Sequence, residues 1–342
     1  MEVDTDTAVK MKPTSTFEPE FNVDFLRIYY DKAFPYELMF KWLSYFKLGS
    51  ESEEQDTVML QSLREEDVKS EYFYNREFSF TLENDVYCRY LCFKSPDEFR
   101  ETLVSRTPHK IDIGAVFNIP PKNHLSTEKK VFIPKEKEMV FDIDMTDYDN
   151  VRTCCTGAKV CPKCWAYMAC ATKVLNQALT EDFGFKAMLW VFSGRRGIHC
   201  WIADEEARTM SNEMRSAVTE YMFLAVGNEQ SAGLELIYPL HPALNRAYQY
   251  LKTKFEQIII RDQELLEHAT HQKKFISLLP YKERDQMTIA FQRSKSGEER
   301  WAKYDAALKV LEAADKKVSG KIAIDIGLNE AKACSYLSLS PN

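Results

Sequence analysis

Residues 139–164 read MVFDIDMTDYDNVRTCCTGAKVCPKC, and this stretch decides the fold. Side chains alternate between the two faces of a β-strand, so MVFDIDM predicts a strand that carries Asp142 and Asp144 on one face. Their Cα atoms would lie about 7 Å apart, close enough to bracket one or two Mg²⁺ or Mn²⁺ ions. The alternative is the solvated face of an edge strand, where acidic residues are common. Asp147 and Asp149 lack apolar alternation, and we interpret them as loop residues.

Four cysteines follow this strand in the pattern C-C-x5-C-x2-C. They are Cys154, Cys155, Cys161 and Cys164. Thiolates at this spacing can hold one Zn²⁺ in tetrahedral coordination. Separate buried thiols are one alternative, but four of the nine cysteines lie within eleven residues, which packing alone does not explain. Disulfides are another, but the other cysteines are odd in number and no apolar signal segment precedes them, which favours a reducing compartment. The apolar spacing that follows predicts a helix over 164–180, starting near Pro162.

Residues 187–203, AMLWVFSGRRGIHCWIA, contain two apolar runs separated by S-G-R-R-G, which predicts a β-hairpin with strands at 187–192 and 198–203. Its polar side chains are Ser193, Arg195, Arg196 and His199. The arginines can hold phosphate oxygens in bidentate fashion, and the serine, the histidine and the glycine amides add further donors. The alternative is an ordinary solvated turn. The nearby carboxylate pair favours a site, because a metal-bound triphosphate needs both kinds of group.

Together, FDIDMTDYD, CC…CPKCW and SGRRGIHCW resemble the catalytic small subunit of the eukaryotic-type (archaeo-eukaryotic) replicative DNA primase. The similarity extends to LRIYYDKAFPYELMFKWL (26–43), YNREFSFTLENDVYCRY (74–90) and KIDIGAVF (110–117). The resemblance implies an α/β (α+β) fold: a primase-type catalytic core with mixed sheets, a small zinc-binding module and a helical subdomain. The Asp-x-Asp pair favours this replicative branch over the primase-polymerases of repair, which carry Asp-x-Glu.

The resemblance also implies a role for each motif residue. Asp142 and Asp144 match the family's first two catalytic aspartates, which hold Mg or Mn, and the four cysteines match its ligands of a structural zinc. The residues implied to contact the nucleotide are Arg89, Asp112, Ser193, Arg195, Arg196 and His199. Glu77 matches a catalytic acidic residue used in initiation. On sequence grounds alone, Arg89 is predicted in a strand and Asp112 in a turn.

The implied function is that of a DNA primase catalytic subunit, a DNA-directed RNA polymerase that synthesises short RNA primers on single-stranded DNA from NTPs in replication initiation. The implied partners are the primase large subunit, the DNA polymerase alpha complex, template, primer and NTPs, and the implied location is the nucleus. One alternative is a catalytically impaired, C-terminally truncated subunit that acts structurally in the primase complex. Another is a zinc-stabilised nucleic-acid-binding module.

The end of the chain departs from the family pattern. The family places a third catalytic aspartate on a late strand, followed by a basic segment that bears a histidine. Here the chain ends KIAIDIGLNEAKACSYLSLSPN, and no histidine follows His271. Asp325 lies between two isoleucines, but its flanks match poorly, and we interpret it as not catalytic. We therefore expect 317–342 to be a truncated, alternatively spliced or wrongly annotated C-terminus.

Composition indicates a soluble globular chain of 342 residues, 45% apolar and 13% aromatic. No apolar run reaches the length of a membrane span, so no membrane association is expected. The net charge of −7 means that contact with DNA must come from a local basic patch or from partner subunits. The predicted segments are a disordered tail (1–17), a catalytic core (18–205) with an acidic insertion (49–70) and a zinc module (150–170), and a helical subdomain (206–316). Within the core, 25–47 is predicted to be one helix and 77–93 to contain strands.

Overall fold

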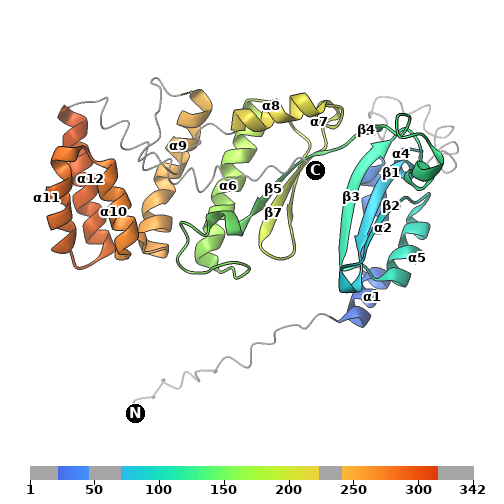
Figure 1. Cartoon of the computed structure of the whole chain (residues 1–342), viewed down its shortest axis with the longest axis horizontal. Helices are drawn as coiled ribbons and strands as arrows, with labels where there is room; N and C mark the ends of the chain where they lie inside the picture. Colours follow the sequence, from blue (N-terminus) through green and yellow to red (C-terminus); the bar gives the residue numbers. More distant parts are fainter. Residues whose placement is uncertain (1–21, 46–70, 223–240, 315–342) are drawn as a thin grey trace, which may run out of the picture. The chain divides into compact units, whose positions relative to one another are not determined.

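The computed structural model describes residues 22–45, 71–222 and 241–314 (Figure 1). These residues form two compact units that divide between Lys135 and Glu136, so the expected core of 18–205 is spread over both units. Some predictions lie outside the described residues: the tail 1–17, the acidic insertion 49–70, and the C-terminal segment 317–342 with Asp325.

The N-terminal unit is built on a sheet with the strand order β2-β1-β3-β4. Its strands are β1 (Arg76–Thr81), β2 (Tyr87–Leu91), β3 (Lys110–Phe117) and β4 (Pro134–Glu136). Its helices are α1 (Val23–Lys32), α2 (Tyr36–Leu43), α4 (Glu71–Tyr74) and α5 (Pro96–Arg106). Both α1 and α2 contact α5. The strands predicted within 77–93 are thus confirmed as the antiparallel pair of β1 and β2.

Aromatic residues form the core of this unit. Alternation along β1 directs Phe78 and Phe80 to one face, where both are fully buried. The ring centroid of Phe78 lies 5.1 Å from that of Phe99 on α5. Each aromatic side chain buries a large apolar surface, so a few of them can stabilise a small core. The intervening residues, Glu77 and Ser79, are left on the opposite face of the sheet.

The prediction of a single helix over 25–47 is wrong, because the chain breaks between α1 and α2. The helix α1 begins after Asn22, whose side chain accepts a hydrogen bond from the backbone N–H of Asp24 at 2.8 Å. Pro35 lacks an N–H and disfavours helical geometry at the preceding residue, so α1 ends and α2 restarts immediately after it.

The second unit contains a sheet with the strand order β5-β7-β6. The strands are β5 (Met139–Asp144), β6 (Met188–Phe192) and β7 (Gly197–Ile202), within a residue of the predicted bounds. In both units the pairings β1–β2, β1–β3, β5–β7 and β6–β7 are antiparallel, and with the helices they form the expected α/β fold. Short hairpin connections, such as that between β6 and β7, permit only antiparallel neighbours.

One face of this sheet packs on the helix α6 (Pro162–Glu181), which begins with proline at its first turn as predicted (Figure 1). Phe141 and Ile143 from β5 are buried in the same apolar cluster as Met168 and Leu175 of α6. The alternation of β5 therefore leaves Asp142 and Asp144 on the other face of the sheet.

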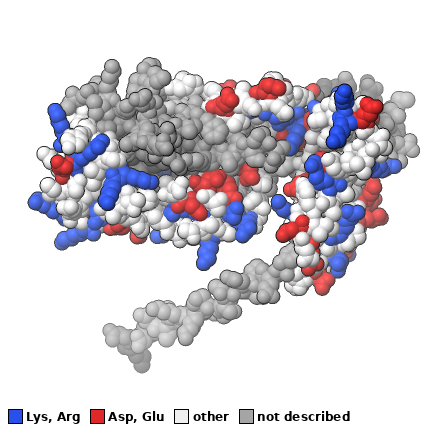
Figure 2. Space-filling model, viewed as in Figure 1, with Lys and Arg blue, Asp and Glu red and all other residues white. Residues whose placement is uncertain are grey.

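The rest of the described chain is helical, as predicted for 206–316. The helices are α7 (Glu205–Arg208), α8 (Asn212–Met222), α9 (Pro242–Phe255), α10 (Ala269–Leu278), α11 (Tyr281–Gln292) and α12 (Gly297–Ala314), with the π-helical turn η4 (Glu256–Asp262) and the 3₁₀ turn η5 (Leu265–Glu267). Lys and Arg outnumber Asp and Glu in 242–314, and Figure 2 shows basic side chains spread over α10, α11 and α12. No helix in the described ranges is apolar over a length sufficient to cross a bilayer.

Candidate metal and nucleotide site

The two strand aspartates lie opposite the returning strand of the hairpin. In the register of β5 and β7, Asp142 pairs with His199 and Asp144 pairs with Gly197. The side chain of Asp142 is 58% exposed and that of Asp144 is 30% exposed, so both carboxylates remain accessible from solvent. The spacing predicted from the sequence thus places two carboxylates on one accessible face.

An arginine and a histidine of the hairpin contact these carboxylates directly. The Nε of Arg196 lies 2.8 Å from both carboxylate oxygens of Asp144. The Nε2 of His199 lies 3.3 Å from Oδ1 of Asp142. The structure therefore brings the two predicted metal ligands into direct contact with two of the residues predicted to bind phosphate.

The environment of Asp144 favours its ionised form. Burial would raise the pKa of this carboxyl, but hydrogen bonds from Thr146 and Arg196 outweigh it and lower the pKa. The backbone N–H and the hydroxyl of Thr146 each donate to Oδ1 of Asp144 at 2.8 Å. Asp144 is thus a carboxylate at neutral pH, the form that a hard divalent cation requires.

The hairpin turn is closed by a hydrogen bond of Ser193. Its Oγ accepts from the backbone N–H of Gly197 at 2.9 Å, and its hydroxyl hydrogen can still be donated elsewhere. Gly194 adopts a φ of 92°, which glycine tolerates at no steric cost, as the S-G-R-R-G pattern predicts. Arg195 is exposed at the tip of the turn.

Gly197 is required by the close approach of two strands, and its replacement by alanine is expected to destabilise the site. A Cβ at this position would lie 2.6 Å from the backbone oxygen of Ile143. Both strands would have to separate, at a cost of about 1 to 3 kcal/mol of unfolding free energy. Urea denaturation followed by circular dichroism would measure the loss. An unchanged midpoint would contradict this close approach.

The remaining predicted site residues lie in the N-terminal unit. The Nε of Arg89 on β2 lies 3.0 Å from Oε1 of the buried Glu77 on β1, and the backbone N–H of Tyr90 donates to the same oxygen. The hydrogen bond with Glu77 raises the pKa of Arg89. The prediction of a turn at Asp112 is wrong, because Asp112 lies within the strand β3 and pairs with Ser79 of β1. Its two isoleucine neighbours pack on the aromatic core and so fix the strand.

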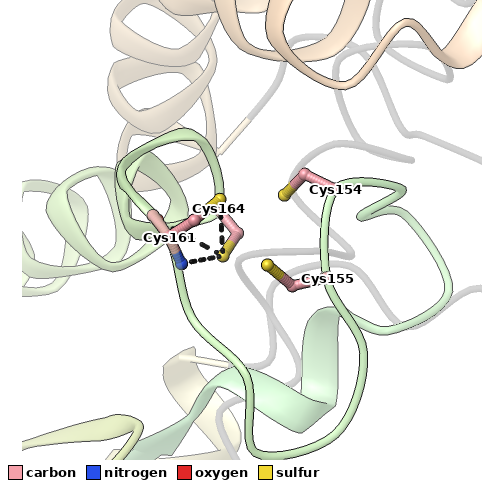
Figure 3. A group of neighbouring side chains, drawn as sticks. All are labelled: Cys154, Cys155, Cys161 and Cys164. Carbon is pink, nitrogen blue, oxygen red and sulfur yellow. Dashed lines mark hydrogen bonds between the residues drawn. The ribbon is translucent and has the colours of Figure 1, made fainter. Parts of the chain in front are cut away.

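The four clustered cysteines converge on one point in the second unit (Figure 3). Their sulfur atoms all lie within 4.8 Å of one another, and those of Cys161 and Cys164 are 3.9 Å apart. A tetrahedral Zn²⁺ with bonds of about 2.3 Å would hold its sulfurs about 3.8 Å apart. Cys161 precedes α6, and its backbone N–H donates to the sulfur of Cys164 at 3.2 Å. The cluster could therefore hold a metal ion.

Crowding of the thiols affects how easily they ionise. Burial, together with the neighbouring thiols, raises the pKa of Cys155 to about 12. A hydrogen bond from the backbone N–H of Cys164 is the main cause that lowers the pKa of Cys161 to about 7. Metal binding would release protons from the cluster, because a thiol must lose its proton to become a metal ligand.

A comparison with protein families identifies the chain. The family model of the DNA primase small subunit matches residues 141–329, which is more than half of the chain. The chain belongs to this family. It is 44% identical over 253 residues to the DNA primase small subunit of Drosophila melanogaster. This match covers 73% of this chain and 53% of that subunit. It is 37% identical over 290 residues to the same subunit of Schizosaccharomyces pombe, a match that covers 82% of this chain and 59% of that subunit.

The chain spans between half and two thirds of the length of the primase small subunits that it matches. The Saccharomyces cerevisiae relative, 37% identical over 246 residues, covers 72% of this chain, whereas the match covers 55% of that relative. The stretch matched by the family model begins on β5 and includes the aspartates, the cysteines and the hairpin. The N-terminal residues Glu77, Arg89 and Asp112 lie before that stretch.

Two residues beside the cysteines were missed by the sequence analysis. Arg152 has a fully buried side chain and donates from Nη1 to the sulfur of Cys164 at 3.9 Å. Gln263 is also fully buried and donates from Nε2 to the sulfur of Cys154 at 3.4 Å. Arg152 lies within the cysteine stretch and could have been noticed there. No sequence signal connects Gln263 with a loop about a hundred positions earlier.

Proposed function

We propose that this chain is the catalytic small subunit of a DNA primase, which joins ribonucleoside triphosphates into short RNA primers on single-stranded DNA. The observation that carries the proposal is the pairing of β5 with the hairpin. Two accessible carboxylates on one strand face the Arg196 guanidinium and the His199 imidazole of the hairpin, in a chain of the primase small subunit family. Such a combination suits a metal-bound triphosphate, which needs both carboxylates and phosphate-binding cations.

In this reaction, Asp142 and Asp144 would hold Mg²⁺ or Mn²⁺ through hard oxygen ligands. The ions, when bound, help to activate the primer 3′-hydroxyl and to neutralise the departing pyrophosphate. Arg196 and His199 would turn from the carboxylates towards phosphate oxygens of the incoming nucleotide. Ser193 and Arg195 would donate to the same triphosphate, in the bidentate manner typical of arginine.

The resemblance to the family also gives roles to three residues of the N-terminal unit. Arg89 would bind the incoming nucleotide, and Asp112 would lie near its sugar. Glu77 would act in initiation, when two nucleotides are joined without an existing primer. The ion pair of Arg89 with Glu77 supports a shared role, because the buried carboxylate holds the guanidinium in place on the sheet.

The cysteine cluster would hold a structural zinc ion. Four thiolates fill a tetrahedral site and leave no open position for water or substrate, so the ion would take no part in the chemistry. The sulfur spacing supports zinc, since the sulfurs of Cys161 and Cys164 are 3.9 Å apart, close to the tetrahedral value, and all four lie within 4.8 Å of one another.

The partners would be the primase large subunit and the DNA polymerase alpha complex, in the nucleus. The net charge of −7 supports a need for partners, because bulk attraction of this chain to DNA is unfavourable. Exposed cations on the helical subdomain would give local contacts with template phosphates. These include Lys273, Lys274, Lys282 and Arg293.

A primer-synthesis assay tests the proposal. The purified chain, alone and with a primase large subunit, is incubated with a polypyrimidine template, purine NTPs and Mn²⁺, and the products are resolved by length. Short RNA products are the expected result. A chain that binds the large subunit but makes no product would be a structural subunit. A chain that binds single-stranded DNA without partner or product would be a zinc-stabilised binding module.

Removing one zinc ligand is expected to destabilise the second unit rather than only slow the reaction. Cys161→Ser leaves three thiolates and exposes the start of α6, so the metal should be lost and the melting temperature should fall. Elemental analysis of freshly purified, reduced protein should find one zinc per wild-type chain and less in the variant. Cys200→Ser, at a buried cysteine outside the cluster, is the control for loss of a thiol. Wild-type protein without zinc would contradict the assignment.

A further inference from the structure

Arg152 is held by the same loop that carries the cysteines. Its Nε donates to Asp149 at 2.5 Å, and its two terminal nitrogens donate to the backbone oxygens of Lys159 at 2.9 Å and Gly157 at 2.7 Å. Nη1 also faces the sulfur of Cys164 at 3.9 Å. A guanidinium buried this completely is costly unless nearby negative charge and acceptors satisfy it. Asp149 and the two backbone oxygens meet this need, and they hold Nη1 beside the Cys164 sulfur.

Gln263 contacts the cluster although it lies far from the cysteines in the sequence, immediately after η4. Its Oε1 accepts from the backbone N–H groups of Thr153 at 2.8 Å and Cys154 at 3.3 Å. Its Nε2 donates to the sulfur of Cys154 at 3.4 Å. One buried amide thus uses both of its ends on the cysteine loop, and joins that loop to the helical subdomain.

We propose that Arg152 and Gln263 are positioning residues of the metal site, and that Gln263 couples metal loading to the packing of the helical subdomain. The inference rests on the proposed binding of zinc by the four cysteines. A divalent ion with four thiolates carries a formal charge of −2, which a buried site must balance. Arg152 supplies positive charge at Cys164, and Gln263 supplies an N–H donor at Cys154. Groups of this kind orient ligands and tune metal affinity.

The contribution of Arg152 can be tested by changing its charge and its shape separately. Arg152→Met removes the charge, whereas Arg152→Lys retains it and loses the planar fork. In the full chain loaded with zinc, transfer of the metal to a chromophoric chelator should show that Arg152→Met binds about 10 to 100-fold more weakly. Arg152→Lys should fall between this variant and the wild type. Arg106→Met, at an exposed arginine, is the matched control and should bind zinc like the wild type.

Gln263→Glu gives a cleaner test, because it retains the oxygen that Thr153 and Cys154 need. It replaces only the Nε2 donor, and places a carboxylate oxygen against the Cys154 sulfur. Zinc affinity should fall about 10 to 100-fold. The spectrum of the Co²⁺-substituted protein should shift, which reports on the sulfurs directly. Gln292→Glu, at an exposed glutamine, is the control with the same change in charge.

Hydrogen exchange tests the coupling. In zinc-loaded wild-type protein, residues 256–267 should be protected, and in Gln263→Glu they should exchange faster together with residues 149–164. Faster exchange of the cysteine loop alone would overturn the coupling. Affinities of Gln263→Glu and of folded Arg152 variants within about twofold of wild type would overturn the positioning role. If Arg152→Met does not fold, Gln263→Glu decides the matter. A wild-type chain that binds neither Zn²⁺ nor Co²⁺ would instead refute the metal site itself.

Discussion

Replacing Asp142 and Asp144 together with asparagine is expected to abolish primer synthesis while the fold remains intact. Both side chains are accessible on β5, and neither belongs to the apolar core. Asparagine keeps the shape of the side chain but removes the negative charge that holds a divalent cation. A catalytic metal contributes several kcal/mol to transition-state stabilisation, and each 1.4 kcal/mol or so is tenfold in rate. The loss should be roughly 10³-fold or more.

The measurement combines primer yield with direct Mn²⁺ binding in the presence of NTP. Both should fall together in the double variant, while circular dichroism and zinc content stay unchanged. Asp97→Asn with Asp285→Asn removes two exposed carboxylates on helices and serves as the control with equal charge. Primer synthesis that survives in the aspartate double variant would exclude these residues as the metal ligands.

The geometry of this site could be predicted from the sequence because it depends on local periodicity. Alternation along β5 determines which face holds Asp142 and Asp144, and the glycine-bounded turn determines where the hairpin folds back. Antiparallel pairing then places His199 and Arg196 beside the carboxylates. The sequence also predicted the start of α6, since proline at the first helical position is a local signal.

Other features depend on contacts that no local pattern shows. Asp112 was predicted in a turn from its residue type alone, but its flanking isoleucines pack on the aromatic core and keep it in β3. The break at Pro35 was overlooked because apolar residues continue on both sides of it. Gln263 was the hardest residue to predict from the sequence. A polar residue between helices gives no sign that its amide is buried against a distant cysteine loop.

Arg196→Ala is expected to weaken nucleotide binding and to strengthen the binding of free metal, two effects of opposite sign. The Nε of Arg196 lies 2.8 Å from both carboxylate oxygens of Asp144. Charge removal at a hydrogen-bonded phosphate contact typically costs about 2 to 5 kcal/mol of binding free energy, which should appear as weaker NTP affinity. The same change frees Asp144 from its cation, so that Mn²⁺ added without nucleotide should bind more tightly than to wild-type protein.

The opposite effects on NTP and Mn²⁺ affinity distinguish two cases. In one, Arg196 exchanges Asp144 for the triphosphate when the ligands bind; in the other, the variant has only lost a positive charge. If the triphosphate takes Arg196 while the metal takes Asp144, each ligand should promote binding of the other, and by linkage the coupling must be reciprocal. Calorimetric titration of Mn²⁺ with and without NTP would measure that coupling, which should shrink in Arg196→Ala. Arg195→Ala is the matched control: its side chain is exposed at the turn, so NTP affinity should fall while free Mn²⁺ affinity stays unchanged.

Weaker binding of free Mn²⁺ by Arg196→Ala would show that the ion pair does not compete with the metal. Loss of single-stranded DNA binding with intact NTP binding would remove Arg196 from the nucleotide site altogether.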